Sequence, residues 1–197
     1  MTLHDIESAN FKLLLVIVSG PPCTGKTTLA RYLASQLELP LIHKDSIKEL
    51  LFDYLGWSDR EWSKKLGRVS IEILYHMLEA QLQAHTSCIV ESVFRPQFDN
   101  ERLQRLQAEY GFMPLQIQCV CDGPTLLQRF KQRAESSTSG RHAGHGDASN
   151  YDEFTPVLLQ GCIAPLDLDG PHIEVDTTDF ANVDYQKIVS TIKNLQR

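Results

Sequence analysis

The stretch "VIVSGPPCTGKTTLARYLA", Val16–Ala34, changes from apolar to glycine-rich to helical character within nineteen residues. The run at positions 13–19, "LLLVIVS", is continuously apolar, as expected for a parallel strand that is covered on both faces. After the turn, Leu29, Leu33 and Leu37 recur along one side of a predicted helix. The order of strand, glycine-rich turn and helix is typical of a loop that binds phosphate.

The eight residues "GPPCTGKT" match the pattern G-x-x-x-x-G-K-[ST]. In such a loop the backbone N–H groups wrap a phosphate, and the positive end of the next helix assists them. Lys26 is expected to reach the β- and γ-phosphates, Thr27 to ligate Mg²⁺, and Thr28 to meet the α-phosphate. A chance match is the alternative, but the position between strand and helix favours nucleotide binding. The residues predicted to contact the nucleotide are Gly20, Pro21, Pro22, Cys23, Thr24, Gly25, Lys26, Thr27 and Thr28.

Segments typical of strands and of helices alternate along most of the chain. This alternation predicts a three-layer α/β/α fold with a mainly five-stranded parallel sheet. The expected strands are residues 13–19, 39–44, 87–94, 113–121 and 172–177. The expected helices are residues 25–37, 45–55, a long helix that opens at 58, 99–111, 123–135, 151–160 and a closing helix that includes 188–195.

The long helix carries two signals of its own. Ser58 and Glu61 form a capping-box pattern at its start. Apolar residues then follow at steps of three and four, which predicts the buried side of the helix. That predicted stripe is Trp62, Leu66, Val69, Ile73 and Met77.

The composition fits a chain with one hydrophobic core. Of 197 residues, 42% are hydrophobic, so we expect a single domain over 1–197 with an N-terminal tail at 1–11. The net charge of −6 gives no general attraction to nucleic acid, although a local basic groove is compatible with it. The N-terminus lacks a signal-peptide pattern and the longest apolar run is short, so we expect a cytoplasmic protein without membrane contact. The sequence specifies no oligomeric state.

The cysteines favour a reducing environment. There are five of them, an odd number, and no two form a CxxC pair. Because three fall inside apolar, strand-like segments, we expect buried free thiols in place of disulfides or metal ligands. They are Cys23, Cys88, Cys119, Cys121 and Cys162.

The phosphate motif is accompanied by "HKDSIKELL" after the second strand, "IVES" in the third and "LLQRFKQRAE" before a polar loop. With these segments the chain resembles small P-loop kinases of the nucleoside-monophosphate-kinase-like group. The closest likeness is to AAA-domain predicted kinases related to polynucleotide 5′-kinases, zeta toxins and chloramphenicol phosphotransferase. It extends from Leu13 to about Asn194. The resemblance implies a P-loop NTPase fold, ATP and Mg²⁺ as cofactors, and a mobile lid at 136–150.

In the segment "HKDSIKELL", the resemblance implies that Asp45 lies beside the acceptor hydroxyl and takes its proton. Lys48 stands one turn later, where relatives often have an arginine that contacts the acceptor. The alternative is that Asp45 only caps its helix, a role compatible with catalysis.

Glu91 ends an apolar run, where relatives often carry an aspartate that holds metal through water or contacts the acceptor. Glutamate departs from the commoner residue, and a plain polar strand end is an equal alternative. Ser92 and Arg95 follow in the loop that borders the acceptor pocket in such folds.

Arg129 and Arg133 are four residues apart, on one helical face. The resemblance implies that Arg129 stacks near the base, that Arg133 reaches the phosphates, and that Arg141 closes over the transferring group. A basic surface helix, paired with Glu135, is the alternative.

The lid string "RHAGHGD" resembles a pattern found in some of these kinases. His142, His145 and Asp147 could suggest a metal site, but their spacing matches no familiar zinc site. We favour a hydrophilic lid in which the glycines allow closure.

The predicted activity is transfer of the γ-phosphate of MgATP to a hydroxyl of a small-molecule acceptor. Lys26, Asp45, Arg133 and Arg141 are the expected catalytic residues. The alternatives are a polynucleotide 5′-hydroxyl kinase, an ATPase or nucleotide-dependent switch, and a pseudo-kinase. A modest basic set favours a small anionic acceptor over a polynucleotide. Its members are Lys44, Lys48, Lys64, Lys65 and Arg68.

Overall fold

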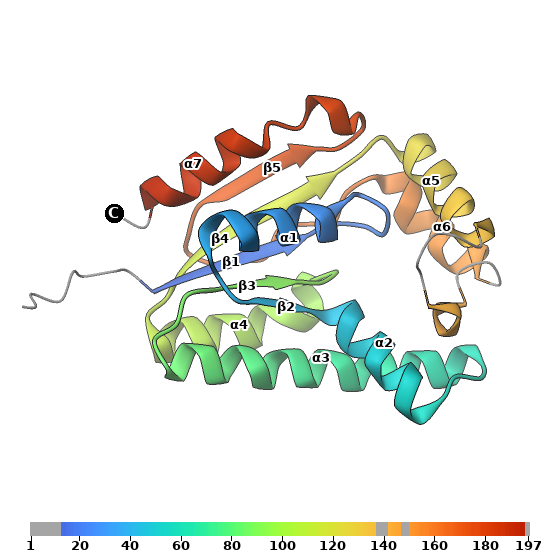
Figure 1. The fold of residues 1–197 in the computed structure, drawn as a ribbon, viewed down its shortest axis with the longest axis horizontal. Coiled ribbons are helices and arrows are strands. Elements are labelled where there is room, and N and C mark those ends of the chain that lie inside the picture. Colours follow the sequence, from blue (N-terminus) through green and yellow to red (C-terminus); the bar gives the residue numbers. More distant parts are fainter. Residues whose placement is uncertain (1–12, 137–141, 147–149, 196–197) are drawn as a thin grey trace, which may run out of the picture.

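The computed structural model describes residues 13–136, 142–146 and 150–195. In this part of the chain, five parallel strands form one sheet in the order β2-β3-β1-β4-β5 (Figure 1). The strands are β1 (Leu14–Ser19), β2 (Leu41–His43), β3 (Cys88–Glu91), β4 (Met113–Val120) and β5 (His172–Asp176). The parallel five-stranded sheet predicted from the sequence is therefore confirmed.

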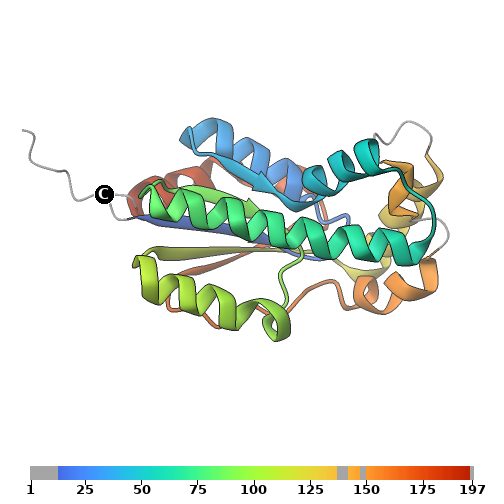
Figure 2. The same ribbon diagram turned by 90° about the horizontal axis from the view of Figure 1, so that it is seen from below.

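Helices cover both faces of this sheet. Helices α1 and α7 lie on one face, and α3 and α4 run side by side across the other (Figures 1 and 2). The helices described are α1 (Lys26–Leu37), α2 (Lys44–Leu55), α3 (Arg60–Gln83), α4 (Pro96–Tyr110), α5 (Gly123–Glu135), α6 (Tyr151–Gln160) and α7 (Tyr185–Leu195). Two short 3₁₀ turns, η1 (Ala143–His145) and η3 (Phe180–Asn182), precede α6 and α7. The three-layer arrangement is as predicted.

Strand β1 shows why its sequence is apolar at every position. Leu14, Val16 and Val18 pack toward α1 and α7, whereas Leu15 and Ile17 pack toward α3 and α4. All six β1 residues are buried. A central parallel strand has no solvent face, so the alternation typical of a half-exposed strand is missing.

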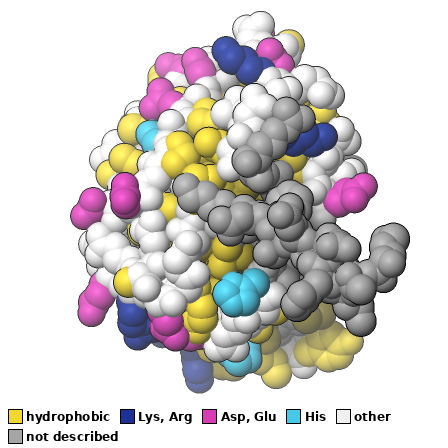
Figure 3. Space-filling view, turned by 90° about the vertical axis from the view of Figure 1, so that its left-hand side faces the viewer, with side chains coloured by type: hydrophobic (Ala, Val, Ile, Leu, Met, Phe, Trp, Pro, Cys, Tyr) yellow, Lys and Arg dark blue, Asp and Glu magenta, His cyan; other side chains and the backbone are white. Residues whose placement is uncertain are grey.

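A third cluster lies beyond the carboxyl ends of the strands. Cys121, Leu126, Phe130 and Leu158 join α5 to α6 there. This packing places α5 and α6 at the same end of the molecule as the loop that follows β1 (Figure 1). The opposite end carries Lys and Arg side chains interspersed with Asp and Glu (Figure 3).

The details predicted for α3 were wrong in two respects. Asp59 caps the helix, because its Oδ1 accepts the Trp62 N–H at 2.8 Å, so the proposed cap residue Ser58 lies one position too early. The buried side is also rotated from the predicted stripe, and Val69 and Met77 are 40% and 43% exposed. The buried positions are Ser63, Leu66, Ser70, Leu74, Tyr75, Leu78 and Leu82. Two of the seven buried positions are therefore serines, which the apolar periodicity did not indicate.

No disulfide joins the five cysteines, all of which lie in described residues. Burial raises the pKa of the Cys88 and Cys119 thiols to about 12. Among the helices described, none combines the length and apolarity needed to cross a membrane.

Candidate active site

The loop between β1 and α1 has a backbone that requires glycine. Gly20 has a φ of 146°, and a Cβ at this position would lie 2.4 Å from the Cys119 carbonyl oxygen. Gly25 has a φ of 77°, in the left-handed region that other residues rarely adopt. The buried Thr24 hydroxyl donates to the Pro21 carbonyl at 2.9 Å and closes the loop. The motif glycines are therefore set by local geometry.

Helix α1 presents amides at the end of this loop. Gly25 is its N-cap and provides no side-chain acceptor. The first helical hydrogen bond described runs from Leu29 N to Gly25 O, at 3.0 Å. The amides of Lys26, Thr27 and Thr28 come before it, among those that have no acceptor inside a helix. They form a positive N-terminus suited to an anion.

Glu91 connects the loop to β2 and β3. Its Oε1 lies 3.7 Å from Lys26 Nζ, and its Oε2 accepts the Thr27 hydroxyl at 3.0 Å and lies 2.7 Å from His43 Nε2. Residues 43 and 91 are partners in the register of β2 and β3, which explains why their side chains meet. Glu91 is 2% exposed, so the structure favours a site residue over a polar strand end.

The Glu91 carboxylate stays ionised in this setting. Burial would raise its pKa, but the Lys26 ammonium and the hydrogen bond with His43 outweigh burial and hold the pKa below its ordinary value. An ionised carboxylate beside the Thr27 hydroxyl is an oxygen donor set of the kind that Mg²⁺ prefers. The residues present therefore fit a magnesium ion on the phosphate side of the site.

Three cavities meet beyond the carboxyl ends of the strands. The loop cavity, of about 450 Å³, lies between Thr28, Arg129 and Phe180. The α3–α4 cavity, of about 550 Å³, lies between α3 and the segment that leads into α4. The α3–α6 cavity, of about 240 Å³, is bounded by α2, α3 and α6. Lys26 and Asp45 line all three.

Asp45 lies in the first turn of α2, one residue inside the helix. The helix starts at Lys44, and His43 is the N-cap residue, so the reading in which Asp45 caps its helix was wrong. Lys44 Nζ lies 3.1 Å from Asp45 Oδ1. The carboxylate is half-buried where the three cavities join.

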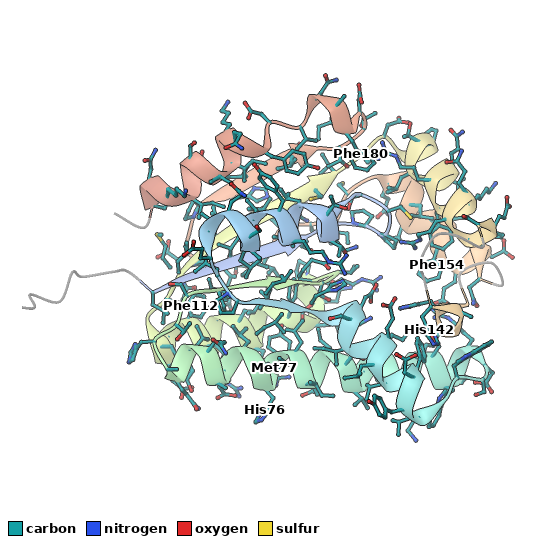
Figure 4. The ribbon with its side chains drawn as sticks, viewed as in Figure 1. His76, Met77, Phe112, His142, Phe154 and Phe180 are labelled. Atoms are coloured by element: carbon teal, nitrogen blue, oxygen red, sulfur yellow. The ribbon has the colours of Figure 1, made fainter. Side chains whose placement is uncertain are left out.

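Arg129 is fixed at the edge of the loop cavity. Its Nη1 and Nη2 donate to the Thr177 and Thr178 carbonyls, both at 2.8 Å. Its guanidinium carbon lies 4.0 Å from the ring centroid of Phe180, in the turn before α7 (Figure 4). Phe180 is 43% exposed and reaches Gly25 of the loop. A guanidinium and an aromatic ring are both groups on which an aromatic base can stack.

Arg133 lines both the loop cavity and the α3–α6 cavity, so it lies where these two cavities adjoin. Its guanidinium carbon lies 5.4 Å from the centroid of Phe130. Arg141, the other arginine predicted to act in catalysis, lies outside the described residues.

Two of the residues predicted to bind the acceptor differ in burial: Lys48 is buried and Arg95 is exposed. Lys48 is 5% exposed, donates to Ser63 Oγ at 2.9 Å, and lies over the Phe52 ring at 5.1 Å. It belongs to the wall of the α3–α6 cavity. Arg95 is exposed and lines both the α3–α4 and the α3–α6 cavities.

Two histidines of the segment predicted as a lid contact α2. The His142 ring stacks on the Phe52 ring, with ring centroids 4.9 Å apart. His142 lies at the same end of the molecule as Phe154 (Figure 4). His145 Nε2 lies 3.0 Å from Glu49 Oε1. Asp147 lies outside the described residues. Within the described ranges, no three His, Cys, Asp or Glu side chains form a group that could hold a metal ion.

The sheet order, the glycine-rich loop and the carboxylate beside its threonine define a P-loop protein with the α/β fold of small P-loop kinases. The AAA-domain family matches residues 15–152, and the chain belongs to this family. No curated protein matches the sequence.

Solved structures extend this likeness over nearly the whole chain. A crystal structure titled "putative kinase", from Chloroflexus aurantiacus, is 42% identical and has a TM-score of 0.85 over 93% of this chain and 98% of its own. A gluconokinase from Sinorhizobium meliloti 1021 is 11% identical, with a TM-score of 0.55 and coverage of 94% of both chains. A sugar kinase from Janibacter sp. HTCC2649 is 13% identical, with a TM-score of 0.52 and coverage of 93% of both chains. The last two show a shared fold.

Two residues of this site were missed in the sequence. His43 precedes "KD" at the end of a strand, and only its pairing with Glu91 across the sheet brings it to the site. Phe180 follows β5 in an irregular segment that has no periodicity to single it out.

Proposed function

We propose that this protein is a kinase that transfers the γ-phosphoryl group of MgATP to a hydroxyl of a small molecule. One observation carries the proposal: Lys26 and Asp45 line both the loop cavity and the α3–α4 cavity. Lys26 could therefore bind the phosphate and Asp45 could accept the proton of a hydroxyl at the point where the loop cavity meets the α3–α4 cavity. The similarity to a 42% identical protein titled as a kinase supports it.

The nucleotide is assigned to the loop cavity. The α1 amides and Lys26 would bind its phosphates, Thr27 and Glu91 would hold Mg²⁺, and Arg129 with Phe180 would stack with its base. Bound Mg²⁺ supplies positive charge that neutralises the phosphate oxygens during transfer.

The chain's own groups account for the transfer. Asp45 would orient the acceptor hydroxyl and accept its proton while that oxygen bonds to the γ-phosphorus. The bond between the γ-phosphorus and the bridging oxygen then breaks, and ADP leaves. Lys26 and Arg133 would stabilise the charge on the transferring group, and closure of the 136–150 lid would exclude water.

The test is transfer of label from γ-labelled ATP to a panel of metabolites and oligonucleotides. Transfer to a small molecule that Lys26→Ala and Asp45→Asn both abolish would support the proposal. Hydrolysis that no acceptor changes would favour an ATPase. Transfer confined to oligonucleotide 5′-ends would favour a polynucleotide kinase.

A further inference from the structure

The α3–α4 cavity has the size of a metabolite site, about 550 Å³. One wall is a single face of α3, with lining residues at the helical spacing of three and four. These are Lys64, Gly67, Arg68, Ile71, Glu72 and Tyr75. The opposite wall comes from Val93 and Arg95 in the segment between β3 and α4, and from Phe98 in the first turn of α4.

Cations dominate this cavity although the whole chain carries a net charge of −6. Four of the lining cations have a carboxylate within 4 Å. They are Lys26 with Glu91, Lys44 with Asp45, Lys64 with Glu61, and Arg102 with Glu72. Arg68 and Arg95 line the same cavity, and neither has an ion pair within the described residues. Two arginines therefore face the cavity with uncompensated charge.

Arg95 is fastened at its backbone. The buried Asp99 accepts the Arg95 N–H at 2.7 Å through Oδ2 and the Tyr75 hydroxyl at 2.7 Å through Oδ1. These bonds occupy both oxygens of the one lining carboxylate that has no cation partner. They also tie the start of α4 to the same face of α3 that carries Arg68. The two arginines are thus held on opposite walls of one cavity.

Gly67 belongs to the α3 wall, in the middle of the 24-residue helix α3, where glycine is unfavourable relative to alanine. Packing does not require it, because a Cβ there would meet only the Lys48 side chain, at 3.8 Å. Gly67 lines both the α3–α4 and the α3–α6 cavities. Gly67 therefore leaves a bare helix surface on the wall that the two cavities share.

We infer that the acceptor is a small hydroxyl compound that also carries an anionic group, a phosphate or a carboxylate, bound by Arg68 and Arg95. This inference rests on the proposed kinase function. The guanidinium fork matches the oxygens of either anion, and its charge does not depend on pH. The acceptor lies across Gly67, with its hydroxyl directed toward Asp45 at the junction of the cavities.

The test is calorimetric titration of the protein saturated with Mg²⁺ and a non-hydrolysable ATP analogue, so that the phosphate loop is occupied. The probes are a neutral sugar, its phosphate ester, the corresponding sugar acid and a short oligonucleotide. We expect the ester or the acid to bind, at least about tenfold more tightly than the neutral sugar, because charge-assisted hydrogen bonds are the stronger ones. The ratio between ester and acid identifies the anion.

Matched variants locate the site. Arg68→Gln and Arg95→Gln should each weaken binding of the anionic probe about tenfold, since each removes a charged donor. Arg105→Gln, an exposed arginine on α4 that lines none of these cavities, should leave it unchanged. Gly67→Ala should weaken probe binding while the melting temperature stays the same or rises.

Four results would each overturn the inference. The neutral and anionic probes bind equally, or neither anionic probe binds. Alternatively, the two arginine variants bind the anionic probe as tightly as the wild type does, or the oligonucleotide binds most tightly. The proposed function fails separately. If the anionic probe binds but no label passes from ATP to it, the anion site stands and the kinase reaction does not. If the ATP analogue itself does not bind, the same titration without it still tests the arginines.

Discussion

The two halves of the site are built in different ways. The half proposed to bind the nucleotide depends on backbone geometry, in a glycine-requiring loop and a helix N-terminus, supported by the buried side chains of Thr24 and Glu91. The acceptor half is mainly side chain, and its arginines at 68 and 95 are exposed on separate elements. Backbone geometry restricts the sequence of the first half closely. Side chains on an open surface can change without disturbing the fold, so under the proposed function the second half would determine which acceptor is used.

The largest expected effect comes from a substitution in the half of the site proposed to bind the nucleotide. Replacing Lys26 by alanine removes the cation nearest the phosphate loop, and kcat/KM for transfer should fall about 10⁴-fold. Steady-state kinetics with labelled ATP measures it. Lys193→Ala, which removes an exposed lysine of α7 that lines none of the three cavities, serves as the control. A Lys26 variant with near-normal turnover would remove this residue from the mechanism.

Arg133 tests the junction between the halves. Its change to alanine should lower kcat about 10³-fold while the affinity for ATP changes little, because an arginine of this kind acts on charge that develops during transfer. Arg129→Ala should do the reverse, weakening ATP binding more than it lowers kcat. Measuring kcat and the Kd for ATP separately for each variant tests this prediction. If both variants changed kcat and Kd by the same factors, the different roles assigned to Arg133 and Arg129 would be contradicted.

A third prediction compares a buried carboxylate with an exposed one. Because the native pKa of Glu91 lies below its ordinary value of 4.5, its charge stabilises the fold above that pH, and the contribution is lost as the pH falls through the native pKa. Glu91→Gln should therefore lower the free energy of unfolding by about 3 kcal/mol at neutral pH, and the deficit should shrink in acid.

The control for Glu91 is Glu72→Gln, which removes an exposed partner of Arg102 on the acceptor side. Denaturant unfolding as a function of pH should show a change below about 1 kcal/mol, because exposed ion pairs contribute little. Equal losses in the two variants at every pH would contradict the assignment of Glu91 as a buried, ionised group.

The smallest expected effect concerns the start of α3. Asp59→Ala should lower the free energy of unfolding by about 1 kcal/mol, since it removes the side-chain cap of the Trp62 N–H. Ser58→Ala should leave stability unchanged. Urea denaturation of the two variants measures the difference, and a greater loss for Ser58 would restore the capping box that the sequence suggested.

Much of the fold could be predicted because the central strands β1, β3 and β4 are short runs of residues buried on both faces. Strand β1 is the clearest case, and the phosphate loop follows it directly. The orientation of α3 could not be predicted in the same way. Ser63 and Ser70 are buried there because Ser63 accepts the Lys48 ammonium and Ser70 donates to the Leu66 carbonyl. Because these buried side chains are hydrogen-bonded serines, the apolar periodicity of the sequence does not indicate which side of α3 is buried.

The candidate site was predictable wherever one local pattern carried it. Lys26, Thr27 and Asp45 all lie close to the loop cavity, as their positions in motifs suggested. His43 required knowledge that β2 pairs with β3 in a register that opposes it to Glu91. Arg68 and Arg95 were both named from the sequence as candidates on the acceptor side, but only the packing of α3 against the segment before α4 places them on one cavity.

The most direct measurement is a crystal structure with Mg²⁺ and a non-hydrolysable ATP analogue. The proposed mechanism predicts the triphosphate within hydrogen-bonding distance of the amides of Lys26, Thr27 and Thr28, with its γ-phosphate directed toward Asp45 and the α3–α4 cavity. A nucleotide bound elsewhere, or one whose γ-phosphate points away from Asp45, would contradict it.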